Sequence, residues 1–473
     1  MEEPSIFHAM LALSSVHKRV CFGVGEAEWE RDPDKLERFT LQQYSKAISH
    51  LLQPRCDPKG KKSARVALIC CMIFICLEIL RGRYNTGNAH LQNGIRLLEG
   101  LQDSRTTTDD SLIEAFTRMN LLAIQFGQGY WVSNALRSPE YERLMITFES
   151  VTQARNCLDD LLGSIFNLKQ RYREEHYTGS PAHSNEAEPE ECLVDQQDRI
   201  KSDLARWFTT YKASRVNFKI QLGRLSKIAY ELLFLHYTMA TILADTCLSS
   251  AEDEMIFDSY GQSFESIVVH SNTVLEAVQA IHSMDNPVFR SGTELFLFNA
   301  DIGWTPPLYY TALHCRVHSI RLRAIDLLRV FPSKEGIWDS MFAASVSEEI
   351  MKLEEAQCSK SSADRDGDLR SPTLPASCRV HDVEVALSDS PTGKAILTCK
   401  RTKDGASHEI ITKDYDIATA QWNGAKISPA DREEASMREE DKQVRQPISP
   451  DMLLQFGPCE RDMGLSPLDL MSF

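Results

Sequence analysis

The fold is decided by the stretch Val66-Ala-Leu-Ile-Cys-Cys-Met-Ile-Phe-Ile-Cys-Leu77, an uninterrupted apolar run that continues to Leu80 across Glu78. A helix that is apolar on every side is buried on every side. A membrane-spanning helix needs about 20 apolar residues, and this run is shorter. The sequence therefore predicts a buried core helix over residues 66–80, with other helices packed around it.

Three amphipathic helices are predicted around this run: one after Ser5 as a candidate N-cap, one between Pro33 and Pro54, and one that ends before Gly100. Helical spacing places their apolar side chains on one stripe each. These stripes contain Phe7, Met10, Leu13 and Val20; Leu41, Tyr44, Ile48, Leu51 and Leu52; and Leu91, Ile95 and Leu98. The short connections predict antiparallel neighbours.

Helical patterns continue over residues 111–169, with a break at 127–131, and again from about Leu204 through 220–248 and 264–281. A further helix is predicted to carry one apolar stripe from Leu313 to Phe331 and to end at Pro332. The arginines of that segment are placed on its other faces: Arg316, Arg321, Arg323 and Arg329. Phe342, Val346, Ile350 and Leu353 mark a last helix.

The apolar period changes from helical to two near the C-terminus, at Val383, Val385 and Leu387, and Asp404-Gly405 is a hairpin signal. The predicted fold class is mainly α, a large irregular helical bundle or array with a small antiparallel β meander. The predicted division is 1–171 and 202–357 as two parts of one helical domain, 172–201 as an acidic loop or linker, 358–376 as a linker, 377–417 as the meander and 418–473 as a flexible acidic tail.

Composition limits the function classes. The chain has 473 residues, of which 42% are hydrophobic, and its net charge is −15. This is the composition of a globular protein with sizeable cores, in two to three units or in one large helical body. An autonomous DNA-binding domain carries a concentrated basic surface, so direct binding of nucleic acid is not expected. The acidic start Met1-Glu-Glu-Pro lacks a secretory n-region, so we expect no export.

Cysteine usage indicates a reducing compartment. The 13 cysteines form no framework spacing and no Cys-x2-Cys pair, which argues against a structural zinc site. Cys70, Cys71 and Cys76 lie inside the apolar run, where thiols pack as small hydrophobes.

Catalytic motifs are not found: the sequence has no Gly-x-Ser-x-Gly elbow, no phosphate loop and no His-Glu-x-x-His. Gly23-Val-Gly25 begins like a dinucleotide fingerprint, but Glu28 occupies the third glycine position. His314 and His318 have metal-ligand spacing on a helix, although a solvated or core-edge pair is the usual reason for it. Asp301 and Trp304, before Pro306, fit a pocket or, more commonly, the start of a helix. The sequence therefore predicts no enzyme, with no catalytic, cofactor-binding or metal-binding residue.

Two weaker signals concern localisation and regulation. Lys59, Lys61, Lys62 and Arg65 form a basic cluster that fits either a nuclear localisation signal or the solvated start of the apolar helix. Ser-Pro pairs fit either proline-directed phosphorylation or plain turns, and five of them lie in the last 103 residues: those at 371, 390, 428, 449 and 466.

The last segment, residues 448–473, alternates acidic and apolar side chains against a single base, Arg461. Such alternation is typical of disordered activation segments, because carboxylates keep the apolar side chains solvated until a partner groove accepts them. A frayed tail, or a short helix that docks on the body, fits the same residues.

Six blocks resemble, in order and spacing, the helical regulatory region of fungal zinc-binuclear-cluster transcription factors. They are His8-Ala-Met-Leu-Ala-Leu-Ser-Ser-Val-His17, Tyr44-Ser-Lys-Ala-Ile-Ser-His-Leu-Leu52, His90-Leu-Gln-Asn-Gly-Ile-Arg-Leu-Leu98, Pro307-Leu-Tyr-Tyr-Thr-Ala-Leu-His-Cys-Arg316, Arg321-Leu-Arg-Ala-Ile-Asp-Leu-Leu-Arg329 and Gly336-Ile-Trp-Asp-Ser340. The resemblance covers roughly residues 5 to 415.

The resemblance implies a nuclear regulator of RNA polymerase II transcription, serving for instance a metabolic gene cluster, with protein partners and room for a small-molecule effector. Such factors read DNA with an N-terminal cluster of six cysteines that holds two zinc ions, built on Cys-x2-Cys-x6-Cys halves. This sequence begins directly at the helical region. We therefore expect no cofactor in this chain, DNA contact only indirectly or through a missing zinc cluster, and no membrane. A helical interaction or ligand-sensing protein without DNA binding, or an enzyme evolved on this scaffold, are the alternatives.

Overall fold

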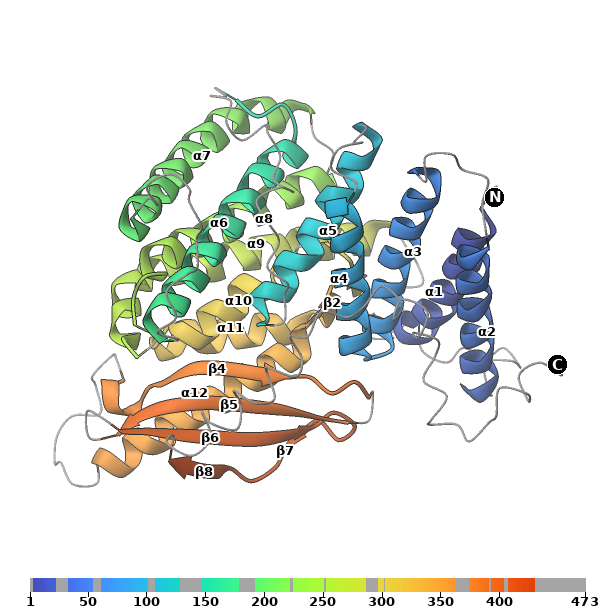
Figure 1. Cartoon of the computed structure of the whole chain (residues 1–473). Coiled ribbons are helices and arrows are strands. Elements are labelled where there is room, and N and C mark those ends of the chain that lie inside the picture. Colours follow the sequence, from blue (N-terminus) through green and yellow to red (C-terminus); the bar gives the residue numbers. More distant parts are fainter. Residues whose placement is uncertain are drawn as a thin grey trace.

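The computed structural model describes residues 3–22, 33–53, 61–100, 107–127, 147–177, 192–221, 224–250, 252–285, 297–301, 303–362, 374–390, 393–403 and 407–429. Helices fill most of these ranges, and one five-stranded antiparallel sheet lies along the underside of the helical body (Figure 1). The predicted fold class, mainly helical with a small antiparallel sheet near the C-terminus, is confirmed.

The N-terminal block contains α1 (Pro4–Phe22), α2 (Pro33–Leu52), α3 (Lys61–Leu80) and α4 (Tyr84–Gly100). The apolar run forms α3, which packs against α1 and α4. Its side chains serve two cores: Ile73, Phe74 and Leu77 meet α1 and α2, whereas Leu68, Ile75 and Ile79 belong to the main core. The predicted core helix is confirmed, and it begins earlier than residue 66.

Two details of this block differ from, or extend, the sequence prediction. Ser5 is a buried residue inside α1, which begins at Pro4, so it is not the N-cap. Ser63–Leu80 is the one stretch in the described ranges that is long and apolar enough to cross a membrane, and 61% of it is buried inside the fold.

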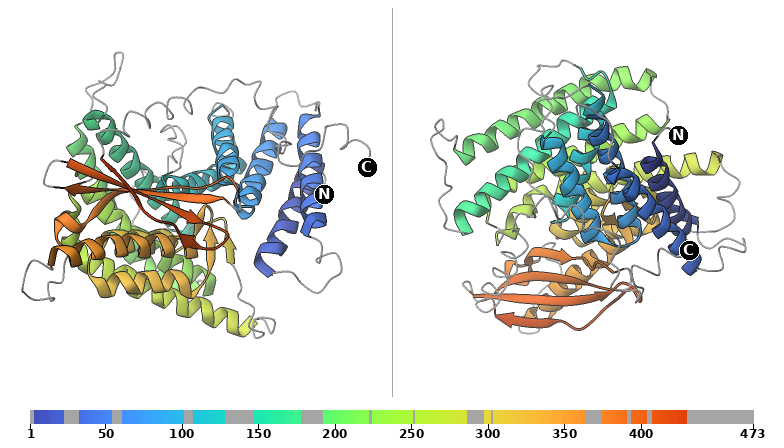
Figure 2. Two further views of the ribbon diagram at one scale, coloured as in Figure 1. Left: turned by 90° about the horizontal axis from the view of Figure 1, so that it is seen from below. Right: turned by 45° about the vertical axis from the view of Figure 1, so that its right-hand side comes forward.

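The middle of the chain forms long helices: α5 (Thr107–Gln125), α6 (Val151–Tyr177), α7 (Leu193–Gln221), α8 (Arg224–Thr246) and α9 (Gly261–Asp285), with the 3-10 helix η5 (Glu254–Tyr260) before α9. Consecutive helices pack together, α5 with α6, α6 with α7, α7 with α8 and α8 with α9. Figure 2 shows the green helices α6 to α8 on the side of the molecule away from the α1–α2 pair, whereas α5 lies nearer and packs against α4. Stacked aromatic rings from α7 and α8, Trp207, Tyr211 and Tyr237 among them, fill the space between those two helices.

A three-stranded sheet joins distant segments: β1 (Leu297–Asn299) pairs in parallel with β2 (Ser333–Glu335), which pairs with β3 (Trp338–Asp339). Gly336, at φ +56°, makes the tight β2–β3 turn. A Cβ there would lie 2.9 Å from Leu122 Cδ1, so only glycine lets the turn approach α5 this closely. The indole of Trp338 donates to the Leu122 carbonyl oxygen at 3.0 Å.

The helical body ends with α10 (Thr305–His314), α11 (His318–Val330) and α12 (Ser340–Ser362). The predicted continuous helix from Leu313 to Phe331 is wrong, because the backbone is extended at Cys315 and Val317. Arg316 lies in this elbow between α10 and α11.

The large sheet contains β4 (Val380–Ala386), β5 (Lys394–Lys403), β6 (Ser407–Asp416), β7 (Gln421–Trp422) and β8 (Lys426–Pro429). It follows the 3-10 helix η7 (Ala376–Cys378), and all pairings are antiparallel. The predicted meander is confirmed. One face packs on α10 and α12 through a core of Leu313, Val346, Ile350, Val380, Leu397, Cys399 and Ile411.

Three predicted loop boundaries are corrected. Helices α6 and α7 extend into the predicted acidic loop 172–201, of which 178–191 lie outside the described residues. Helix α12 reaches Ser362, inside the predicted linker. Within the predicted flexible tail 418–473, β7 and β8 pair with β6, and residues 430–473 lie outside the described residues.

Candidate functional site

A buried polar cluster, called the anchoring cluster below, lies where the sheet meets the helical body. It is built around Arg316, in the α10–α11 elbow, and Arg321, on α11, whose side chains are only 1% and 2% exposed. The sequence pattern places both on faces of one helix other than its apolar stripe, whereas the structure buries both. A buried guanidinium needs counter-charges and hydrogen-bond acceptors, so the neighbouring elements must supply both.

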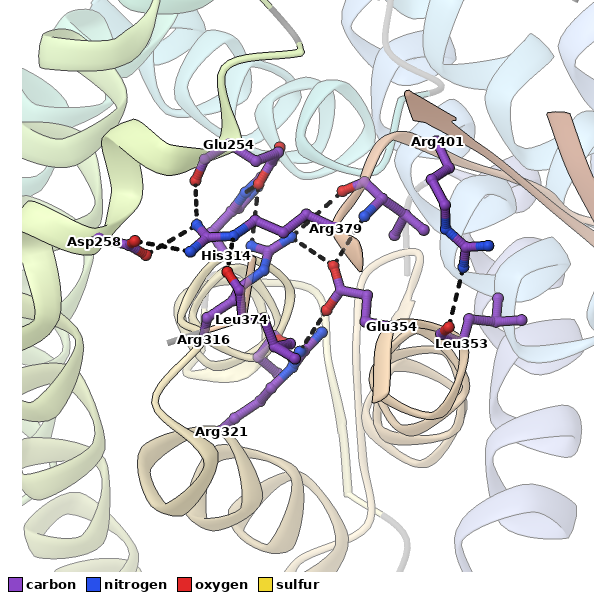
Figure 3. A network of polar contacts seen from close by, with 12 residues as sticks. Glu254, Asp258, His314, Arg316, Arg321, Leu353, Glu354, Leu374, Arg379 and Arg401 are labelled. Atoms are coloured by element: carbon purple, nitrogen blue, oxygen red, sulfur yellow. Dashed lines mark hydrogen bonds and ion pairs between the residues drawn. The ribbon is translucent and has the colours of Figure 1, made fainter. Parts of the chain in front are cut away.

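Glu354 of α12 supplies the central counter-charge (Figure 3). Its Oε1 accepts from Arg316 Nη2 at 2.8 Å and from the backbone N–H of Val380 at 3.0 Å. Its Oε2 accepts from Arg321 Nη1 at 2.6 Å, and Arg321 Nε donates to the Ala312 carbonyl oxygen. One carboxylate therefore joins the elbow, α11, α12 and the first residue of β4.

Glu254 and Asp258 of η5 extend the cluster (Figure 3). Glu254 Oε2 lies 3.0 Å from Arg316 Nη1 and 3.3 Å from His314 Nδ1. Arg379, the residue before β4, donates to the Glu254 backbone carbonyl oxygen and forms a paired contact with both carboxylate oxygens of Asp258, at 2.9 and 2.7 Å. Three guanidinium groups thus face three carboxylates.

The surrounding charges favour the ionised forms of Glu354 and Glu254. Burial alone would raise the pKa of Glu354, but Arg316 and Arg321 outweigh it and hold that pKa below its ordinary value. The pKa of Glu254 is lowered in the same way against its burial, by His314 and Arg316. Burial lowers the pKa of His314, against the opposing effect of Glu254.

The arrangement fixes one orientation of the sheet on the helices. Arg401 of β5 adds a direct bond from strand to helix, because its Nη2 donates to the Leu353 carbonyl oxygen at 3.0 Å (Figure 3). Each carboxylate of the cluster is occupied by an arginine, and guanidinium groups do not exchange protons near neutral pH. The chemistry of the cluster is therefore anchoring and positioning, and sequence reasoning missed it. One signal was available: Arg321 lies four residues before Ile325 and seven before Leu328, on the buried side of α11.

A second buried cluster surrounds the start of α10. The Glu335 carboxylate accepts the backbone N–H of Thr305 at 3.0 Å, and burial raises the pKa of Glu335 to about 7. A Cβ at Gly303 would overlap this carboxylate. His236 Nε2 lies 2.7 Å from the Gly303 carbonyl oxygen, and burial lowers its pKa to about 4.

Asp159, on α6, is another buried carboxyl whose pKa is raised. Burial raises this pKa to about 7, although Arg118 Nε lies 3.6 Å from Oδ2. Arg155, on the same helix, pairs with Asp301.

The residues that the sequence suggests as site candidates do not lie together in one site. His314 ends α10 and His318 begins α11, so they do not share a helix, and they contact Glu254 and Glu355 respectively. Trp304 is the buried N-cap residue of α10, with prolines in its first turn, as expected of a helix start.

The cysteines show no zinc arrangement where the structure describes them. Cys70 and Cys76 are buried in α3, as predicted for thiols that pack as hydrophobes. No group of three or more His, Cys, Asp or Glu residues in the described ranges is placed to hold a metal. The described residues therefore do not fit the zinc cluster that the family resemblance implies.

Several sequence signals lie wholly or partly outside the described residues. Gly23-Val-Gly25, the hairpin turn Asp404-Gly405 and the tail 448–473 are outside them. Of the basic cluster, Lys59 is outside, whereas Lys61 to Arg65 form the beginning of α3.

An open depression lies between α6 and α7. Its lining is part polar and part apolar: Arg171, Tyr172, Glu175, His176, Cys192, Leu193, Val194 and Leu248.

Comparison with known proteins agrees with this architecture. Residues 1–341 match the family described as the fungal specific transcription factor domain. Over 113 residues the chain is 29% identical to the transcription regulator lscL of Purpureocillium lilacinum, a stretch that covers 24% of this chain and 26% of that protein. The chain thus aligns with about a quarter of that relative's length. No solved structure matches.

The matched range contains the helices α1 to α11, whereas Glu354 and Arg379 of the anchoring cluster lie beyond it. The match defines the class as a fungal transcription-factor-like regulatory protein. The chain belongs to the fungal specific transcription factor domain family.

Proposed function

We propose that this chain regulates RNA polymerase II transcription in the nucleus, and that its helical body acts through protein partners. The observation that carries the proposal is the family match over residues 1–341, which contains the helices α1 to α11. The net charge of −15 supports contact with proteins of the transcription machinery, since phosphate binding needs a concentrated basic surface.

A non-enzymatic role is part of the proposal. The buried carboxylates at the helix–sheet junction are paired with arginines, and His314 Nδ1 lies 3.3 Å from Glu254 Oε2. Catalytic acid–base pairs expose one group to a substrate and hold their pKa values apart for that task. The described cluster supports positioning of the sheet instead.

The proposal is tested by tethering. The full chain is fused to an unrelated DNA-binding domain in a fungal reporter strain, and reporter output is compared with that of the DNA-binding domain alone. We expect a change in output in either direction. The variant Ile73→Asp, which breaks the core around α3, abolishes the change, and Leu52→Asp, at an exposed position, keeps it. Unchanged output from an abundant nuclear fusion contradicts the proposal.

Two further measurements test separate parts of the proposal, the nuclear localisation and the contribution of the C-terminal tail. A fluorescent fusion of the full chain is expected in the nucleus, and replacement of Lys59, Lys61, Lys62 and Arg65 by Ala shows whether the basic cluster directs it there. Removal of residues 430–473 from the tethered fusion separates activation by the tail from the effect of the body.

The chain is expected to contain no cofactor and to need a partner, or a zinc cluster outside it, to read DNA. Purified full chain should carry no stoichiometric zinc and should not shift one duplex in preference to competitor DNA. A saturable, sequence-specific shift by the chain alone is evidence against this part. For the proposed metabolic gene cluster, transcript profiling of a deletion strain should show changes concentrated in neighbouring genes.

A further inference from the structure

Two cysteines meet at the helix–sheet junction. Cys358 lies near the end of α12, and Cys378 ends η7, directly before Arg379 and β4. Their elements α12 and η7 pack against each other, and the two thiols lie in hydrogen-bonding contact although twenty positions separate them in sequence. Both are reduced, Cys378 is fully buried, and Cys358 is half-buried.

The pair lies beside the anchoring cluster. Cys358 is one helical turn after Glu354 on α12, and Cys378 is followed by Arg379 and by Val380, whose N–H is bound by Glu354. A covalent bond between the thiols would therefore connect the same two elements that Glu354 connects through hydrogen bonds.

We propose that Cys358 and Cys378 are an oxidation site, at which peroxide converts the two thiols into a reversible disulfide that locks α12 to the start of β4. The proposal rests on the contact between the thiols, on the access to Cys358 and on the position of the pair next to Glu354.

The chemistry balances with hydrogen peroxide as the oxidant. The Cys358 thiolate attacks one peroxide oxygen, the O–O bond breaks, and a sulfenic acid forms while the leaving hydroxide is protonated to water. The Cys378 sulfur then attacks the sulfenyl sulfur, the S–O bond breaks, and the proton from Cys378 leaves with the hydroxide as a second water. Two thiols are oxidised to one disulfide and one peroxide is reduced to two waters. A dithiol reductant reverses the bond by exchange.

The order of the steps follows from exposure. Burial raises the pKa of the Cys378 thiol, and no solvent reaches it. Cys358 is the more exposed of the two residues, so it reacts first and Cys378 resolves the sulfenic acid.

The test uses the reduced full chain. The protein is exposed to a small excess of hydrogen peroxide, the remaining thiols are alkylated, and the peptides are mapped without reduction. We expect one cross-linked peptide that joins Cys358 to Cys378, at more than about tenfold the level of any other disulfide, and its loss on treatment with a dithiol. Cys192, which is exposed at the start of α7, is the matched control. Cys192→Ser leaves the cross-link unchanged and Cys358→Ser removes it.

A second readout tests the lock. Oxidised wild-type protein should unfold at a higher urea concentration than reduced protein, and Cys358→Ser should show no such difference. Two results overturn the proposal. One is separate alkylation of Cys358 and Cys378 under peroxide that oxidises Cys192, and the other is accumulation of sulfinic acid at Cys358 with Cys378 still reduced. A cross-link without a change in unfolding also overturns the lock.

Discussion

Arg321 on α11 and Glu354 on α12 form a buried ion pair, with Nη1 and Oε2 only 2.6 Å apart although 33 residues separate them in sequence. Because Glu354 also holds Arg316 and the backbone N–H of Val380, this pair is the centre of the contact between the helical body and the sheet.

Glu354→Ala should therefore be strongly destabilising. It leaves the guanidinium groups of Arg316 and Arg321 buried without their shared counter-ion, and removal of one partner of a buried pair costs about 3–5 kcal/mol. Urea unfolding of the full chain measures the loss. The matched control is Glu355→Ala, one residue further on, whose partially exposed side chain contacts His318 and should cost no more than about 1 kcal/mol. Equal losses for the two variants are incompatible with the proposed anchoring role.

Gly94→Ala and Gly163→Ala should change stability in opposite directions. Both glycines lie within helices, but a Cβ at Gly94 would overlap the Phe116 ring, whereas a Cβ at Gly163 meets nothing within 4 Å. Overpacking costs about 1–3 kcal/mol. Replacement of an unconstrained helical glycine gains about 0.4–1 kcal/mol. Thermal unfolding of the two variants beside wild type gives the signs, and a more stable Gly94→Ala would show that α4 and α5 pack more loosely than the structure has them.

Glu335→Gln should remove one contribution to the pH dependence of the free energy of unfolding. Burial raises the pKa of Glu335 to about 7, against 4.5 for a free side chain, so the fold favours the protonated carboxyl. The stability from this group is fully present below about pH 4.5 and is lost as the pH rises through 7, by about 3 kcal/mol in total. The variant should gain stability relative to wild type over that window. Parallel curves for the two proteins would mean that Glu335 is ionised in the fold at pH 5.

Ile73→Asp should unfold or aggregate the helical body. Ile73 is 8% exposed in the core between α1, α2 and α3, and an unpaired buried carboxylate there costs several kcal/mol, comparable with the whole stability of a domain. Leu52→Asp, at a side chain that is 58% exposed, should leave the protein folded. Circular dichroism and size-exclusion chromatography distinguish the two. An Ile73→Asp protein with an unchanged melting midpoint would show that α3 is not central.

Regular patterns made much of the fold predictable. The apolar run gave α3, and Leu91, Ile95 and Leu98 are buried in α4 as their spacing requires. The elbow at Arg316 has neither glycine nor proline, so the apolar pattern from Leu313 to Phe331 predicted one continuous helix. Strands β7 and β8 are too short for a period of two to be recognised, and their charged surroundings conceal them.

Local sequence could place Arg321 on the buried side of α11, but it could not predict the pairings of the anchoring cluster. An arginine in a helical pattern is placed in solvent by default, because its burial depends on partners elsewhere. For Arg321 that partner is Glu354, and for Arg379 it is Asp258, more than a hundred residues earlier. Such pairings arise only from the three-dimensional arrangement of η5, α11 and α12.

The family match ends at residue 341, just after α12 begins, yet the sheet and α12 cover Leu313 and neutralise Arg316 and Arg321. A fragment cut at that position would expose an apolar face that carries unbalanced positive charge. The segment that relatives share is therefore shorter than the segment that must fold together. Expression fragments and transplanted regulatory modules of this protein need to extend through β8.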